Sequence, residues 1–158
     1  MEKENIDVFK RHNVLSKHEL HARTDILLEN YIKTINIEAN VTLSIAKRQI
    51  LPVCLDYCTN LAASASVLAD AGTACKTVQK TLEKVSTLTD QLGEAVEKLE
   101  KAAEKASKPG KTNLQARSYR DDVIPAMLEV RAAADALEML VDATLWPLPS
   151  YAEMLFMK

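Results

Sequence analysis

The residues His18, Glu19 and His21 come nearest in type to a metal-dependent active site. A zinc protease motif H-E-x-x-H places its second histidine four residues after the first. A carboxylate-bridged di-iron bundle needs a histidine three residues after each of two glutamates. Both spacings point to position 22, which is Ala22. We therefore interpret these side chains as polar groups on the first turns of a helix.

Cys54 and Cys58 are four residues apart and could offer two thiolates from one helical face. A structural zinc site uses four ligands, and no second Cys or His pair follows, because Cys75 stands alone. We expect buried, free thiols and no metal. Three cysteines give no disulfide framework and are typical of a reducing compartment.

Four carboxylates come into question as general acids or bases: Glu29, Glu38, Asp121 and Asp122. The first is spaced to pair with Lys33, and the last two follow Arg117 and Arg120 in a charged patch, which is usually solvated. With three glycines in the chain, a backbone cradle for phosphate is hard to build. We expect no catalytic, cofactor-binding or metal-binding residue, and no catalysis by this chain alone.

The composition indicates an all-α protein in which few, long elements fill 158 residues. It is 47% hydrophobic and 27% charged, as in soluble globular proteins, with three Gly and five Pro for turns. Its net charge of −2 disfavours nucleic acid as a partner. No apolar run approaches the roughly 20 residues of a membrane span, and the first residues do not resemble a signal peptide. We expect a cytoplasmic protein without a membrane partner.

The pattern along the chain predicts a single all-helical domain over residues 1–158, an elongated antiparallel bundle. Ser16 and Glu19 form the sequence signature of a capping box, Gly72 is placed as a glycine that ends a helix, and Thr73 can cap the next helix. The expected elements are a short helix 5–12, a long helix 16–71 kinked at Pro52, a coiled-coil-like hairpin of helices 74–106 and 112–144, and a proline-containing tail 145–158.

Two apolar seams with alternating spacings of three and four residues support the hairpin. The first comprises Val78, Leu82, Val85, Thr89, Leu92, Val96, Leu99, Ala103 and Ala106. The second comprises Ala116, Tyr119, Val123, Ala126, Val130, Ala133, Leu137 and Leu140. Glu94 with Lys98 and Glu97 with Lys101 are expected to pair on the solvated side. Pro125 should bend the second helix.

The long helix is apolar on more than one side. One face carries Leu28, Ile32, Ile35, Ala39 and Ala46. Other faces carry Ile37, Val41, Leu43, Ile45 and Ile50. The hairpin can cover only one side, so we expect either the segment after Pro52 or another protein to cover the rest.

The tail contains the chain's one Trp and one of its two Phe behind a proline-broken segment. Prolines 147 and 149 prevent a continuous helix. The apolar tail residues are Trp146, Leu148, Tyr151, Leu155 and Phe156. Leaving Trp and Phe in water forfeits on the order of 2 to 3 kcal/mol each. We expect them to dock either on the bundle itself or on a protein part outside it.

Four stretches are distinctive as strings: Tyr31 to Ala39, Ala46 to Pro52, Tyr119 to Met127, and Trp146 to Tyr151. They resemble the C-terminal helical region of type III glutamine synthetase, and the similarity runs from about Asn5 to Phe156. The resemblance implies that the chain is part of a larger polypeptide in a ring-built homo-oligomer. That enzyme is a glutamate–ammonia ligase of nitrogen metabolism that uses ATP and Mg²⁺ in a catalytic domain preceding this region.

No position of the chain matches the catalytic motifs of that family, so no catalytic residue is carried over. The leading hypothesis is a noncatalytic C-terminal domain that supports the catalytic domain and subunit assembly. The alternatives are a free-standing coiled-coil interaction module or dimeric helical adaptor, and a metal-dependent bundle enzyme.

Overall fold

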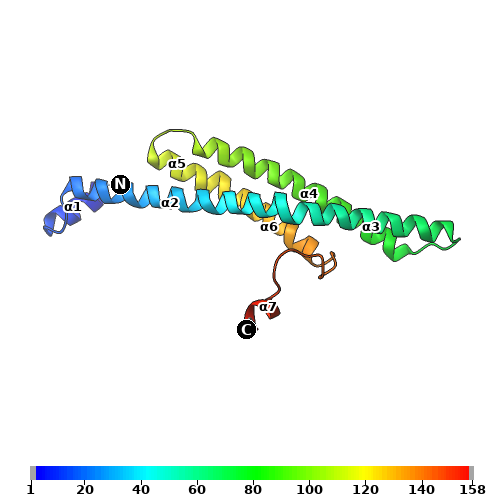
Figure 1. Ribbon diagram of the computed structural model, residues 1–158. Helices are drawn as coiled ribbons and strands as arrows, with labels where there is room; N and C mark the ends of the chain where they lie inside the picture. Colours follow the sequence, from blue (N-terminus) through cyan, green and yellow to red (C-terminus); the bar gives the residue numbers. More distant parts are fainter. Residues whose placement is uncertain (1–2, 157–158) are drawn as a thin grey trace.

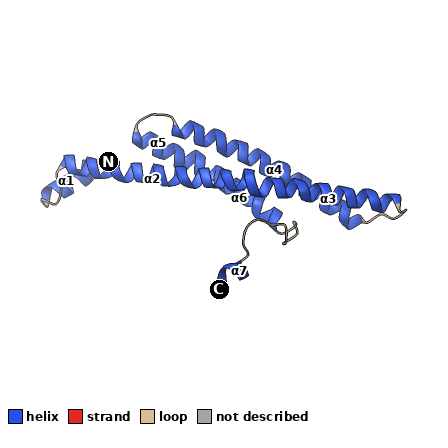
Figure 2. Ribbon diagram, in the orientation of Figure 1, coloured by secondary structure: helices blue, strands red, loops and turns tan. Residues whose placement is uncertain are grey.

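The computed structural model describes residues 3–156, and within that part the chain is helical or irregular, with no strand. This confirms the predicted all-α class (Figure 2). The first and last two residues of the predicted domain lie outside the described residues, as does the side chain of Tyr151.

Seven α-helices and two π-helical turns follow one another in the described part. In chain order they are α1 (Lys3–Arg11), α2 (Lys17–Ile45), η1 (Ala46–Ile50), α3 (Leu51–Asp70), α4 (Lys76–Ser107), α5 (Thr112–Ser118), η2 (Tyr119–Val123), α6 (Ile124–Glu138) and α7 (Tyr151–Leu155).

A long rod and a hairpin make up the bundle. Elements α2, η1 and α3 form one continuous rod of 54 residues, about 80 Å long at the standard helical rise. In Figure 1 the chain turns back at the end of α3, so that α4 runs antiparallel to the rod, and α5 to α6 run back alongside α4. The tail leaves the bundle after α6 and carries α7 away from it. The structure is therefore elongated, with a protruding C-terminal element.

Two local signals in the sequence determine helix ends as predicted. The Ser16 N–H donates to Glu19 Oε2 at 2.7 Å, and the Glu19 N–H donates to Ser16 Oγ at 3.3 Å, which completes the capping box of α2. Gly72 has a φ of +74°, the left-handed conformation that glycine adopts without strain at a helix end. Thr73 does not cap α4, because its hydroxyl donates back to the Leu68 carbonyl at 3.1 Å. The helix begins only at Lys76.

Pro52 does not break the rod but follows a π-helical turn. In η1 the N–H of Leu51 donates to the Ala46 carbonyl, five residues back instead of four. The extra residue in this turn accommodates a proline that has no N–H to donate and whose ring would crowd the preceding turn of an α-helix. The helix thus continues through Pro52, as expected, and a π turn stands at the position where a kink was predicted.

The π turn also brings the apolar stripe of α3 into line with that of α2. At a constant 100° per residue, the stripe of α3 would lie about 60° around the rod from that of α2. The wider turn takes up this difference, so that Ala46, Ile50 and Cys54 are all buried on one side, at 1%, 4% and 0% exposure. Ile50, expected on a separate face, belongs to the core for this reason.

A second π turn precedes the second proline in the same way. In η2 the N–H of Ile124 donates to the Tyr119 carbonyl, and Pro125 follows at the start of α6. Both prolines inside long helices are therefore accommodated by one widened turn each. Tyr119 and Val123 from this turn are fully buried.

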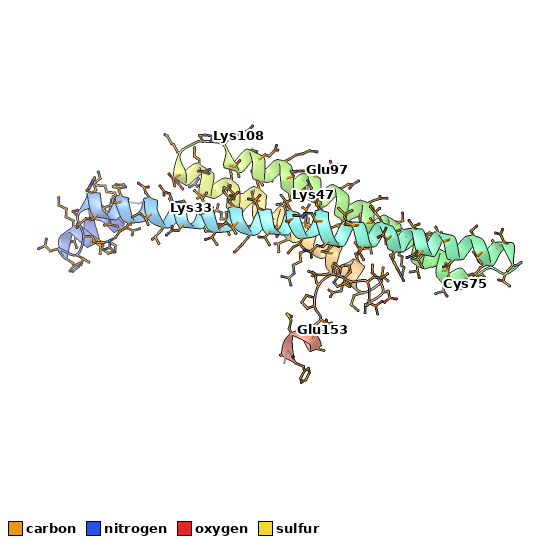
Figure 3. The ribbon with its side chains drawn as sticks, viewed as in Figure 1. Lys33, Lys47, Cys75, Glu97, Lys108 and Glu153 are labelled. Carbon is orange, nitrogen blue, oxygen red and sulfur yellow. The ribbon has the colours of Figure 1, made fainter. Side chains whose placement is uncertain are left out.

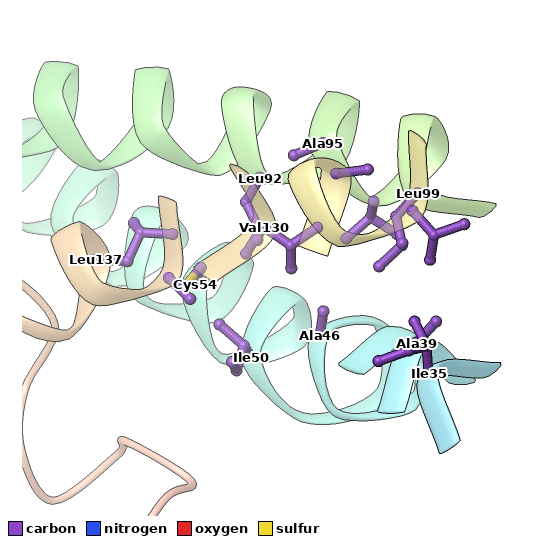
Figure 4. Packing of buried hydrophobic residues seen from close by; sticks show 14 of the residues in the cluster. Ile35, Ala39, Ala46, Ile50, Cys54, Leu92, Ala95, Leu99, Val130 and Leu137 are labelled. Carbon is purple, nitrogen blue, oxygen red and sulfur yellow. The ribbon is translucent and has the colours of Figure 1, made fainter. Parts of the chain in front are cut away.

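The core lies where α4 faces both the rod and the returning helix, and Figure 4 shows Leu92 and Leu99 of α4 there with Val130 of α6. From the first predicted seam the structure buries Val85, Thr89, Leu92, Val96, Leu99, Ala103 and Ala106. In the second helix six of the eight predicted seam residues are buried, Leu137 among them, whereas Ala134 and Val141 are buried in place of their predicted neighbours Ala133 and Leu140.

Helix α6 ends at Glu138, earlier than the predicted residue 144. Beyond this end, the Asp142 carboxylate accepts hydrogen bonds from both the N–H and the hydroxyl of Thr144 at 2.8 and 2.7 Å. Such a local side-chain turn competes with helical hydrogen bonding. The chain therefore changes direction before Trp146.

Candidate interaction surfaces

His18, Glu19 and His21 are all exposed on the first turns of α2, as the sequence indicated. The carboxylate of Glu19 is engaged in the capping box, and the hydrogen bonds from Ser16 lower its pKa. Among residues 3–156, no three His, Cys, Asp or Glu side chains come together to hold a metal ion. The absence of a metal site in the whole chain stays a prediction.

The three cysteines are free thiols with very different environments. Cys54 is fully buried, Cys58 is half-buried, and Cys75 is exposed in the loop before α4. Figure 3 shows Cys75 at the far end of the molecule. Burial, and secondarily the neighbouring Cys58, raises the pKa of the Cys54 thiol to about 11. A buried thiol of this kind is unreactive and serves the packing of the core.

The free energy of unfolding is expected to fall between pH 9 and pH 11 because of Cys54. An unfolded thiol ionises near its ordinary pKa of 9.0, whereas the folded one keeps its proton up to about pH 11. The contribution is therefore fully present below pH 9 and is lost as the pH rises through this window, by about 3 kcal/mol. Urea denaturation across the window measures it. A Cys54→Ala variant that shows the same loss would contradict this assignment.

Of the four candidate carboxylates, Glu29, Asp121 and Asp122 pair with basic side chains, and Glu38 is exposed. Glu29 contacts Lys33 at 3.4 Å, as predicted, and Asp121 contacts the guanidinium of Arg120 at 2.7 Å. The Arg120 hydrogen bonds lower the pKa of Asp121. A carboxylate held ionised at an exposed position has no feature of a general acid.

Three ion pairs join separate elements, and each has α4 as one side. Lys47 of η1 pairs with Glu100, Lys98 with Glu129 of α6, and Lys105 with Asp122 of η2, at 2.7, 2.6 and 3.1 Å. Lys98 therefore does not pair with Glu94, which was the sequence expectation, whereas Glu97 and Lys101 do pair, at 3.3 Å. Exposed pairs of this kind contribute little to stability individually.

The molecule has more accessible surface than a compact protein of its size. The chain of 17.5 kDa has 11266 Å² of accessible surface. A compact monomer of this mass has about 7,900 Å². The difference is larger than the roughly 1,600 Å² that a standard protein interface buries in total. Much of the bundle is therefore available for contacts with other protein surfaces.

Apolar side chains lie on the rod where the hairpin does not cover it. Ile37 and Val41, predicted to lie off the main face, are 63% and 50% exposed. Other large apolar residues of the rod that are more than half exposed are Ile26, Leu27, Leu55 and Val67. The expected surplus of apolar surface on the rod is therefore present.

The rod also has one property of a membrane span. An 18-residue window within Lys17–Asp70 has a mean hydropathy of 1.2, and 11% of that window is buried. This differs from the expectation that no apolar run approaches the length of a span. The evidence for a membrane span comes from length and composition only. The same rod buries one stripe of apolar side chains against the hairpin. The absence of a membrane partner stays a prediction.

Trp146 connects the tail to the bundle. Its indole is half-buried and packs against the edge of the core. The indole Nε1, however, is a buried donor without a hydrogen-bond acceptor. A buried donor left unpaired costs about 1 to 3 kcal/mol. In the isolated chain the tail therefore leaves one buried hydrogen-bond donor, the indole N–H of Trp146, unpaired.

Helix α7 is folded but leaves its apolar side chains in solvent. Ser150 and Glu153 form a second capping box, in which the Ser150 N–H donates to Glu153 Oε2 at 2.6 Å and the Glu153 N–H donates to Ser150 Oγ at 3.3 Å. Met154, Leu155 and Phe156 at the end of the tail are 49%, 76% and 80% exposed. Of the two expectations for the tail, docking on its own bundle therefore holds for Trp146 but not for the last turn.

Two open grooves accompany these surfaces. One, of about 520 Å³, lies between α4 and α6 and is crossed by the Lys98–Glu129 pair. The other, of about 630 Å³, lies between the end of α6 and the tail and is lined by Trp146, Leu148 and Glu153 among others. Both are lined by mixed polar and apolar groups.

Comparison with known proteins gives one consistent result. Residues 1–69 match the family model described as glutamine synthetase C-terminal domain. The chain is 32% identical over 160 residues to the type-3 glutamine synthetase of Dictyostelium discoideum and 31% identical over 156 residues to the glutamine synthetase of Butyrivibrio fibrisolvens. These alignments cover 98% and 97% of this chain but 22% of either relative.

A third relative, the glutamine synthetase of Bacteroides fragilis (strain YCH46), is 25% identical over 92% of the chain and 21% of its own length. The chain thus spans about a fifth of the length of the relatives that it matches. Its predicted resemblance to the C-terminal helical domain of type III glutamine synthetase is confirmed.

Proposed function

We propose that this chain is the noncatalytic C-terminal helical domain of a type III glutamine synthetase, which supports the catalytic domain and contributes to contacts between subunits. The whole enzyme would join ammonia to glutamate at the expense of ATP in the assimilation of nitrogen. The observation that carries the proposal is the match of 98% of the chain to 22% of a much longer relative. The large uncovered surface and the exposed apolar residues of the rod support it.

ATP and magnesium belong, in this proposal, to the catalytic domain and not to this chain. This assignment is supported for magnesium by the described residues, among which no three metal-ligating side chains come together. Of the three glycines only Gly72 has a positive φ, and it ends a helix. The proposed role of this chain is packing and assembly. Its proposed location is the cytoplasm.

A chimeric enzyme tests the proposal directly. In the Butyrivibrio fibrisolvens glutamine synthetase, the region that matches this chain is replaced by residues 1–158 of this chain. We expect the chimera to keep most of the parent's glutamine synthesis and its oligomeric size, whereas the parent without that region loses both. Sedimentation and an activity assay measure the two properties. A truncated parent that assembles and turns over normally would contradict the supporting role.

The alternative is a free-standing interaction module, and the uncovered apolar residues of the rod are the observation in its favour. It predicts that the isolated chain forms a discrete dimer and that the chimera behaves no better than the truncated parent. Sedimentation of the isolated chain over a range of concentrations distinguishes the two proposals.

A further inference from the structure

We propose that the tail, residues 145–156, is the element through which this domain docks on the catalytic part of the glutamine synthetase polypeptide, with Met154, Leu155 and Phe156 entering an apolar groove of that part. This inference rests on the proposed function and identifies the surface that carries it out. The rest of the domain would then be held relative to the catalytic part by its C-terminal end.

The tail is prepared for such a contact before the contact forms. The capping box of Ser150 and Glu153 satisfies the first N–H groups of α7, although Figures 1 and 3 show this helix standing away from the bundle. Hydrogen bonds from the N–H and the hydroxyl of Ser150 lower the pKa of Glu153. A helix that is already formed loses less conformational entropy when it binds.

Trp146, at the start of the tail, indicates which polar group the binding partner should offer. The Nε1 of Trp146 is buried and has no acceptor in the isolated chain. Tryptophan at an interface usually donates this N–H to a partner oxygen. We therefore expect the apolar groove to be bordered by a carbonyl or carboxylate oxygen that accepts from Trp146 once the tail has docked.

The size of the contact favours a tethered partner over a second, free copy of the chain. At no more than roughly 200 Å² each, the middle of the range for a buried aromatic side chain, Met154, Leu155 and Phe156 bury at most about 600 Å². A stable complex between separate proteins uses about 800 Å² from each partner. A partner in the same polypeptide has a high effective concentration and needs less area. In the relatives, nearly four fifths of the polypeptide lies outside the matching region and supplies such a partner.

Hydrogen exchange compares the tail in the isolated chain and in the chimeric enzyme described above. We expect the amides of residues 152–156 to exchange at least tenfold more slowly in the chimera. The variant Leu155→Ala/Phe156→Ala should abolish this protection and lower the thermal midpoint of the chimera. The control variant Ile26→Ala/Leu27→Ala changes two residues that are 59% and 69% exposed on α2, outside the tail, and should leave the protection of the tail amides unchanged.

The outcomes separate this inference from the proposed function. An active, assembled chimera whose tail exchanges as fast as in the isolated chain overturns the inference alone. The inference is also overturned if the tail amides of the Leu155→Ala/Phe156→Ala chimera still exchange slowly. A chimera that neither assembles nor turns over contradicts the proposed function, and the inference is overturned with it. Circular dichroism of the isolated variants verifies that none of the substitutions unfolds the bundle.

Trp146→Phe gives a second, independent comparison. The substitution keeps an aromatic ring and removes the N–H. In the isolated chain the N–H has no acceptor, so the thermal midpoint should change little or rise. In the chimera the same substitution should lower the midpoint, because it removes a hydrogen bond formed on docking. Equal shifts in the two proteins would overturn the assignment of an acceptor on the catalytic part.

Discussion

Deletion of one exposed residue of α4, Glu94, is expected to lower the free energy of unfolding by more than about 5 kcal/mol. Each residue turns an α-helix by about 100°, so the deletion rotates one half of α4 relative to the other. Leu92 lies before the deletion and Val96 and Leu99 lie after it, and all three are buried. Only one half can then keep its contacts with the neighbouring helices. Urea denaturation followed by circular dichroism measures the loss.

Deletion of Gln49 from η1 is the matched control, because this residue is also exposed. A π turn holds one residue more than an α turn, so its loss leaves the buried faces of α2 and α3 aligned. The cost should not exceed about 3 kcal/mol, which is the cost of Pro52 in an ordinary helical turn. Adding Pro52→Ala should recover most of that cost. Equal losses for the Gln49 and Glu94 deletions would show that the π turn does not align the rod.

Leu92→Ala is expected to destabilise the protein by about 3 kcal/mol. Leu92 is 0% exposed in α4, and Figure 4 shows its side chain facing Val130 of α6 and Cys54 of α3. Truncation to alanine loses the burial of the side chain and leaves a cavity in a region where three helices meet. Chemical denaturation of the purified variant measures the difference.

Leu27→Ala is the control for this substitution, because Leu27 lies on the rod and is 69% exposed. Its effect should stay within about 0.5 kcal/mol, as for most surface substitutions. If Leu92→Ala costs no more than Leu27→Ala, the core does not lie where α4 meets α3 and α6.

Local sequence signals predict much of the fold because the atoms concerned are close in the chain. Ser16 and Glu19 are three residues apart, and their reciprocal hydrogen bonds depend on little else. Gly72 ends a helix because of its own backbone freedom. The seam of α4 was predictable because its period is regular and no proline interrupts it.

Other features depend on contacts that a pattern of spacings does not contain. The π turns before Pro52 and Pro125 change the angle per residue, so a constant period places Ile50 on the wrong face. The pairing of Lys98 with Glu129 depends on how α6 lies against α4, and not on residues four positions away. The change of direction after α6 includes a turn in which Asp142 accepts from Thr144, and the apolar spacing does not contain this contact.

The sequence predicted that apolar surface would need a partner, but it did not predict which residues would be exposed. The sequence indicated that the apolar tail and the extra faces of the rod needed cover. It did not indicate that Trp146 would lie on the bundle while Phe156 remains exposed, because that outcome depends on the turn at Asp142. The unpaired N–H of Trp146 likewise results from burial, and no sequence pattern predicts it.

Trp146 is the sole tryptophan of the chain, and it lies where the tail meets the bundle. Its fluorescence therefore gives an optical signal from that junction alone, whereas circular dichroism reports the helices as a whole. In one titration with denaturant, release of the tail and melting of the bundle can be followed as separate transitions. The molecule thus has a built-in spectroscopic probe, and no dye has to be attached.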